Sequence, residues 1–91
     1  MSNLEFLIHE VKQCGEVVSV SGIVNKGKVP LRAEFVSLRN ESGDESIVRL
    51  KVSNIVAYRR QIDELPTGMS GELHLSGDGA SQLAKHFMLT D

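Results

Sequence analysis

The segment at residues 17–28 reads VVSVSGIVNKGK and decides the fold class of this 91-residue chain. Valines recur at alternate positions from Val18 to Val24, which is the period of an extended strand with one face in a core. Gly22 interrupts this series, and a glycine inside a strand is expected where a barrel bends tightly or another backbone comes close. The Asn-Lys-Gly sequence at residues 25–27 then predicts a turn, because asparagine and glycine both tolerate a positive φ.

Similar runs of alternating apolar and polar residues occur along the rest of the chain. We expect further strands at residues 34–38, 48–53, 72–76 and 87–89. Valine and isoleucine together number fifteen against four alanines, which favours sheet over helix. Polar turns that contain glycine separate several of these runs, at residues 40–44, 66–68 and 76–79. Short strands with regular turns predict an all-β fold with little helix, either a small antiparallel barrel or a sandwich.

Three segments leave their local structure open. Residues 2–11 fit a helix, because Ser2 and Glu5 form a capping box, but their apolar residues also alternate as in a strand. Residues 58–65 fit either a loop or one helical turn. Residues 80–86 favour a helical turn.

Composition and charge mainly exclude classes of protein. Ten basic and twelve acidic residues give a net charge of −2, whereas a protein that neutralises many phosphates usually carries a basic excess. The single cysteine, Cys14, cannot form an internal disulfide, which fits a reducing compartment. The chain shows no signal peptide and no apolar run as long as a membrane span. We therefore expect a cytoplasmic protein with no membrane partner and one domain over residues 1–91.

From Val17 onward the chain resembles domain 2 of the elongation factor Tu family of translation GTPases. The resemblance covers residues 15–89. Its first motifs are a V-x-G-x-V strand at residues 20–24 and the turn that ends at Gly27. The later motifs are an aromatic residue with basic neighbours, an acidic pair, a Thr-Gly turn before an apolar strand, and a short closing segment; they lie at residues 55–60, 63–64, 67–77 and 83–89. The resemblance implies a closed six-stranded antiparallel β-barrel.

The sequence departs from that family at identifiable positions. Arg32 and His86 stand where the family usually has glycine. The chain has no GTPase domain and no phosphate-binding loop, so we expect no GTP hydrolysis. Structural glycines are expected at strand ends and at the strand interruption, namely Gly22, Gly27, Gly68 and Gly77.

Candidate catalytic and metal-binding residues form no recognisable constellation. Cys14 and His9 are close in sequence, but this spacing does not place them side by side, and the three histidines lack metal-ligand spacing. The acidic pair at residues 63–64 fits a solvated loop, and Gly-Asp-Gly at residues 77–79 fits a turn better than a phosphate loop. We therefore expect a non-enzymatic binding module without catalytic residues, metal or cofactor.

The basic residues are the better candidates for function. In the resembled family, domain 2 helps to bind the aminoacyl end of transfer RNA and to dock on ribosomal RNA. If the basic residues share one face of the barrel, they form a small RNA-facing patch with the single tyrosine available for stacking. The alternative is a set of solvated side chains on separate loops. The candidate RNA-binding residues are Lys26, Lys28, Arg32, Tyr58, Arg59 and Arg60.

A second interpretation is a protein-interaction module, or one that self-associates as a homo-oligomer. In the resembled family this barrel packs against the GTPase domain, and a barrel alone would offer that surface to a partner or to a second copy. Candidate exposed apolar residues for such a contact are Phe6, Ile62, Leu65, Met69 and Phe87.

Overall fold

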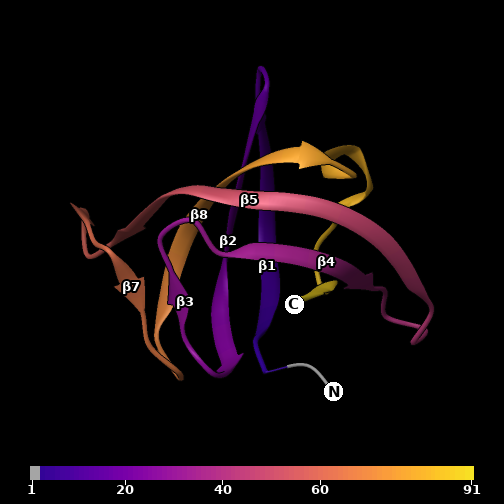
Figure 1. Ribbon diagram of the computed structural model, residues 1–91, viewed down its shortest axis with the longest axis horizontal. Coiled ribbons are helices and arrows are strands. Elements are labelled where there is room, and N and C mark those ends of the chain that lie inside the picture. The colour runs from indigo at the N-terminus through magenta and orange to yellow at the C-terminus, as the bar shows by residue number, and fades with distance from the viewer. Residues whose placement is uncertain (1–2) are drawn as a thin grey trace.

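Nearly all of the regular structure in this protein is β-strand. The computed structural model describes residues 3–91, in which nine strands and one short 3₁₀ turn follow one another (Figure 1). The strands are β1 (Glu5–Cys14), β2 (Val17–Lys26), β3 (Val29–Pro30), β4 (Glu34–Arg39), β5 (Glu45–Ala57), β6 (Arg60–Gln61), β7 (Glu64–Leu65), β8 (Ser70–Asp78) and β9 (Met88–Thr90), and the turn η1 is Ala80–Gln82. The all-β prediction is confirmed.

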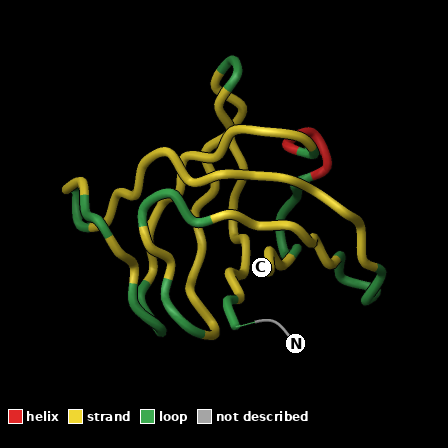
Figure 2. The backbone as a smooth tube through the Cα atoms, viewed as in Figure 1, coloured by secondary structure: helices red, strands yellow, loops and turns green. Residues whose placement is uncertain are grey.

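Six of these strands close into a barrel. Their order is β4-β9-β1-β2-β8-β5, and a further pairing of β4 with β5 joins the two ends of the sheet. All of these pairings are antiparallel. Figure 2 shows the long strands curving around a common centre. The expected closed six-stranded antiparallel barrel is therefore confirmed, and closure pairs the two end strands β4 and β5 with each other instead of leaving both as edges.

The core lies inside the barrel and follows the alternation seen in the sequence. In β5, Val48, Leu50 and Val52 are buried while Arg49 and Lys51 between them are exposed. The same rule holds in β2, where the valines of the V-x-V series face inward. Side chains alternate between the two faces of a strand, so one face of each strand fills the core.

Strand β4 departs from simple alternation because it contains a register shift. Phe35 and Leu38 are both buried although they are three residues apart, and Val36 between them is exposed. The pairing of β4 with β5 shifts by one residue between Phe35 and Ser37. The extra residue belongs to β5, where Val48 and Arg49 lie between the partners of Phe35 and Ser37, and beyond this shift Leu38 of β4 faces inward.

The open alternative at the N-terminus is resolved in favour of a strand. Phe6 and Ile8 are completely buried, and β1 pairs with β2 along its length and with β9 at residues 5–7. The helix alternative for this segment is wrong over its described part. The proposed cap residue Ser2 lies outside the described residues.

The other two open segments have different outcomes. Within residues 58–65, β6 and β7 are two-residue strands, so the helical-turn alternative is wrong there. Residues 80–82 form the 3₁₀ turn η1, which agrees with the expected helical turn.

Two positions where the resembled family has glycine adopt the conformation that glycine favours. Arg32 has a φ of 71° and His86 a φ of 73°, both in the left-handed region. A side chain with a Cβ costs roughly 1–2 kcal/mol per residue in this conformation. The backbone turns are therefore kept although the glycines are replaced.

Candidate nucleic-acid interface

The two basic segments of the chain lie side by side. Strands β3 and β7 form a small separate ladder in which Val29 pairs with Leu65 and Pro30 with Glu64. This ladder joins the segment at residues 26–32 to the segment at residues 58–65. The tertiary structure thus brings the middle of the first segment against the end of the second, at residues 29–30 and 64–65.

Acidic side chains accompany the cations in this region. Lys28 Nζ lies 3.2 Å from Glu64 Oε1, and both side chains are largely exposed. An exposed ion pair of this kind contributes little to stability and exchanges readily with solvent or ligand. The segment at residues 26–32 has three positive charges, whereas the two cations and two carboxylates of residues 58–65 cancel. The local excess of positive charge is therefore small.

Tyr58 and Arg59 occupy the two-residue loop of the β5–β6 hairpin. Both have a positive φ, 54° and 64°, and the flanking residues Ala57 and Arg60 pair with each other. This is a type I′ turn, for which Asn-Gly is the favoured sequence. The Tyr58 side chain is 80% exposed. The loop projects at the left of Figure 1. The Arg59 side chain is also exposed.

The remaining basic candidates are placed by neighbouring turns. Lys26 is the last residue of β2 and pairs with Glu5. Arg32 lies in the turn between β3 and β4, where its N–H donates a hydrogen bond of 3.1 Å to the carbonyl oxygen of Val52. All of these side chains are exposed.

A hollow of about 290 Å³ opens beside Tyr58. Gly22 and Gly71, which pair across β2 and β8, are among the residues that line it. The remaining lining residues are His9, Ser21, Val56, Ala57 and Ser70. Sequence reasoning did not find this hollow, because its lining comes from β1, β2, β5, β8 and the β5–β6 loop. The glycine in β2 was the one available signal.

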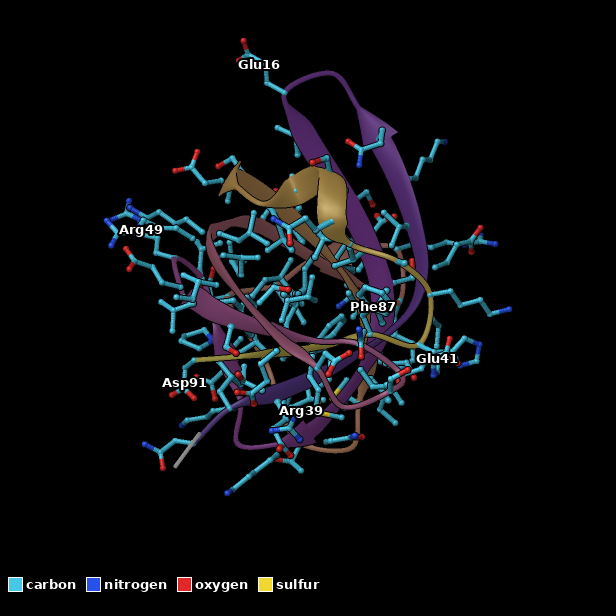
Figure 3. The ribbon with its side chains drawn as sticks, turned by 90° about the vertical axis from the view of Figure 1, so that its right-hand side faces the viewer. Glu16, Arg39, Glu41, Arg49, Phe87 and Asp91 are labelled. Carbon is cyan, nitrogen blue, oxygen red and sulfur yellow. The ribbon has the colours of Figure 1, made fainter. Side chains whose placement is uncertain are left out.

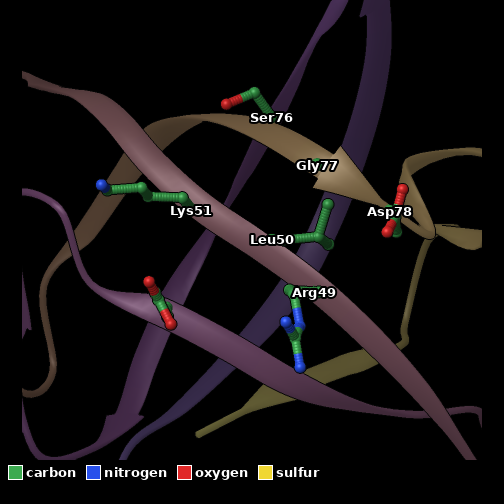
Figure 4. Close-up of a pocket in the computed structure, with 7 residues that line it drawn as sticks. Arg49, Leu50, Lys51, Ser76, Gly77 and Asp78 are labelled. Atoms are coloured by element: carbon green, nitrogen blue, oxygen red, sulfur yellow. The ribbon is translucent and has the colours of Figure 1, made fainter.

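A second hollow, of about 340 Å³, lies on the outer surface of β5 between β4 and β8 (Figure 4). Arg49 and Lys51 of β5 share it with Glu34 and Asp78. Two cations and two carboxylates give it no net charge. This mixed lining does not select one class of ligand.

The outer face of β2 and β8 holds a serine, a glutamate and a histidine in contact. Ser19 Oγ donates a hydrogen bond of 2.7 Å to Glu72 Oε1, and His74 Nε2 lies 3.3 Å from Glu72 Oε2. The hydrogen bond from Ser19 lowers the pKa of Glu72; burial opposes it, and the His74 ring and the charge of Lys12 add to the lowering. Because the carboxylate stands between serine and histidine, the imidazole contacts no hydroxyl that it could activate.

Two absences apply to the part of the chain that the structure describes. No group of three or more His, Cys, Asp or Glu side chains is placed to hold a metal ion within residues 3–91. The same residues contain no helix of the length and hydrophobicity needed to cross a membrane.

The predicted exposure is wrong for Phe6 and Leu65, which are completely buried inside the barrel. The other three proposed residues, Ile62, Met69 and Phe87, are partly buried against the core. Within residues 3–91 the large exposed apolar residues are Leu31, Val36, Ile47 and Tyr58, with Ile47 the most exposed at 91%.

Comparison with solved structures finds the same fold in translation elongation factors. The apo form of translation elongation factor SelB from Methanococcus maripaludis superposes with a TM-score of 0.80 at 20% identity, over 100% of this chain and 20% of that one. The complex of that factor with the GTP analogue GppNHp gives 0.75 at 20% identity, over 100% and 20%. A bacterial selenocysteine-specific elongation factor, EF-Sec, gives 0.70 at 15% identity, over 98% and 14%.

These similarities establish the fold. The resemblance to a barrel domain of translation GTPases is confirmed at that level, and the chain spans a fifth or less of the length of the proteins it matches. No protein-family model matches the chain. No curated protein matches it either.

Proposed function

We propose that this chain is a non-enzymatic binding module of translation that contacts RNA, on transfer RNA or on the ribosome. The observation that carries the proposal is the position of Tyr58, an exposed aromatic ring beside a hollow lined in part by Gly22 and Gly71. Arg59 and Arg60 follow it directly. Unstacked RNA bases are bound by stacking on aromatic side chains, with nearby cations holding the backbone.

The distribution of charge supports a small area of contact with RNA. Lys28 pairs with Glu64, and Asp63 and Glu64 offset the charges of Arg59 and Arg60, so the local positive charge is limited. We therefore expect few phosphate contacts and a correspondingly small salt dependence. The fold similarity to translation elongation factors supports the same class of function, and a cytoplasmic location is part of the proposal.

A binding role agrees better with the side chains than catalysis does. In the serine–glutamate–histidine contact on β2 and β8, Ser19 is buried, and its hydroxyl donates to the Glu72 carboxylate, whose lowered pKa makes it a weak base. A nucleophile needs an effective base within hydrogen-bond reach. The proposal therefore assigns no catalytic residue to this chain.

The test is RNA binding measured over a salt series. The intact chain is titrated against fluorescent transfer RNA and, separately, sedimented with ribosomes. We expect binding that weakens with salt, and in Arg59→Gln/Arg60→Gln a salt slope smaller by about 1 to 2. The matched control Arg49→Gln/Lys51→Gln removes the same charge from the outer surface of β5 and is expected to bind like the wild type.

Two outcomes contradict the proposal. One is the absence of binding to both RNAs at low salt. The other is equal weakening by the two double variants, which means that net charge alone is responsible.

A protein partner is the second candidate function, and one observation favours it. Ile47 on β5 is 91% exposed, and the exposed Val36 lies on the adjacent strand β4. An exposed apolar pair on neighbouring strands is a common feature of protein contacts. A partner that co-purifies with the wild type but is lost with Ile47→Ser, while RNA binding persists, would support this function.

A further inference from the structure

The second half of β1 is an open sheet edge. Strand β9 pairs with β1 at residues 5–7, and Ile8 then exchanges backbone hydrogen bonds of 2.8 Å with His86 and Phe87. Beyond Ile8, no backbone hydrogen bond within residues 3–91 joins β1 to any element other than β2. The β1–β2 hairpin stands clear of the barrel in Figure 1, and Figure 3 shows Glu16 at its tip, far from Arg39 and Asp91.

The pairing register identifies the backbone groups that point outward at this edge. Cys14 and Val17 flank the two-residue hairpin loop, so they form a hydrogen-bonded pair. Such pairs alternate along an antiparallel ladder, so Lys12 is the next residue bonded to β2, through Ser19. The N–H and C=O groups of Val11 and Gln13 therefore point away from β2, toward solvent.

Side chains at this edge leave the backbone accessible. Val11 packs partly against the core, and Gln13 Nε2 donates a hydrogen bond of 3.4 Å to the carbonyl oxygen of Ala80. These two side chains lie on the inner face of the hairpin. Glu10 and Lys12 lie on the outer face, are exposed, and make no ion pair within residues 3–91.

We propose that this edge pairs with the same edge of a second copy of the chain. The two β1 strands run antiparallel about a two-fold axis at Val11, whose N–H and C=O bond to the partner's Val11. In this register Glu10 of each copy faces the partner's Lys12, and Lys12 faces the partner's Glu10. Opposite charges directly across a non-hydrogen-bonded position attract at short range.

The charges also exclude the neighbouring register. A two-fold axis at Lys12 would place two lysine side chains directly opposite each other, which is destabilising. The Glu-x-Lys spacing of residues 10–12 is therefore self-complementary in one register and repulsive in the next. Beyond this segment the ladder is limited by the register shift between Ile8 and Glu10. The pairing is short, so we expect a weak dimer.

The dimer is closed and separate from the proposed RNA interface. A two-fold contact uses the same patch on both copies, so it saturates at two chains and does not propagate. Its residues differ from those of the β5–β6 loop and the β3–β7 ladder. The inference therefore does not rest on the RNA proposal and can fail or succeed independently of it.

The test is a charge-swap series measured by sedimentation equilibrium up to a concentration of about 1 mM, where weak association is detectable. We expect reversible dimerisation of the wild type. Glu10→Lys and Lys12→Glu each place like charges opposite one another twice, so each is expected to raise the dimer Kd at least about tenfold. The double variant Glu10→Lys/Lys12→Glu restores both opposite-charge pairs and is expected to dimerise like the wild type.

Two further variants separate the edge from general effects. Val11→Pro removes the outward N–H and no bond to β2, so it is expected to remain folded by circular dichroism and to be monomeric. Glu41→Lys reverses a charge in the exposed β4–β5 loop and is expected to leave dimerisation unchanged. A wild type that is monomeric at every concentration overturns the proposal. A double swap that stays as weak as the single variants overturns it as well.

Discussion

Gly22 in β2 lies so close to Leu7 in β1 that a Cβ atom at position 22 would overlap the Leu7 carbonyl oxygen. The register shift of the β1–β2 ladder, between Ile8 and Glu10, lies directly beside this contact. The glycine therefore permits a close approach of two backbones, one of the two reasons for which a strand glycine is expected.

Substitution of Gly22 is expected to destabilise the barrel strongly. In Gly22→Ala the new methyl group meets backbone, which cannot rotate away, so one strand has to shift. We expect a loss of about 3 kcal/mol or more in the free energy of unfolding, measured by chemical denaturation. Ser21→Ala, one residue away and half-buried, is the control and is expected to change stability by less than about 1 kcal/mol. Equal losses in the two variants would remove the close approach as the explanation.

Restoring glycine at the two left-handed positions is expected to stabilise the protein. Arg32→Gly and His86→Gly relieve the strain of φ values near 70°, and glycine's greater freedom in the unfolded chain offsets part of the gain. We expect about 0.5–1 kcal/mol of added stability from each, measured as a higher Tm. Lys85→Gly, next to His86 but without a positive φ, is expected to be neutral or destabilising. Loss of stability at both left-handed positions would contradict this prediction.

The β5–β6 loop is expected to show opposite effects on stability and on binding. Tyr58→Asn/Arg59→Gly introduces the sequence that a type I′ turn favours, so the Tm should rise. The same change removes the aromatic ring and one cation from the proposed RNA interface, so RNA affinity should fall. Strained residues that persist at an exposed tip are expected where they serve a function. A variant that is more stable and binds RNA as tightly as the wild type would argue against a binding role for this loop.

The Glu72 cluster makes stability depend on pH in the acidic range. The hydrogen bond from Ser19 lowers the pKa of Glu72 below its ordinary value of 4.5, so folding favours the ionised form. The stabilisation is complete above the ordinary value and is lost as the pH falls through the lowered one. Glu72→Gln is therefore expected to be less stable than the wild type at pH 7, with a gap that narrows below about pH 4.5. Denaturation curves at pH 7 and pH 3 measure the two gaps, and a gap of constant size would contradict the assignment.

Strands with one solvent-exposed face were predictable from the sequence. Segments whose apolar pattern fits both a helix and a strand were not. In β5, exposed Arg49 and Lys51 alternate with buried residues, so hydropathy alone marks both the strand and its inner face. In the first segment, Leu4, Leu7, Ile8 and Val11 have helical spacing, whereas Leu4, Phe6 and Ile8 alternate as in a strand. Pairing with β2 and β9 decides between them, and that pairing involves residues far away in sequence.

The candidate interface was predictable in its residues but not in its arrangement. The basic and aromatic residues can be read from the sequence, and the β3–β7 ladder that joins their two segments cannot, because it depends on closure of the barrel. Exposure of apolar side chains was predicted wrongly for Phe6 and Leu65 for the same reason. Which apolar side chains face outward is a property of the assembled sheet.

The sequence by itself determined the all-β class, the turn positions and the local conformations at glycines, because alternation and backbone freedom act over a few neighbouring residues. Only the tertiary structure decided which strand edges are paired and which residues from different strands lie together on the surface. Closure of β4 onto β5 buries one face of every long strand, brings Tyr58 beside Gly22 and Gly71, and leaves the outer part of β1 without a neighbour. These features depend on contacts between residues far apart in the chain, which no local pattern records.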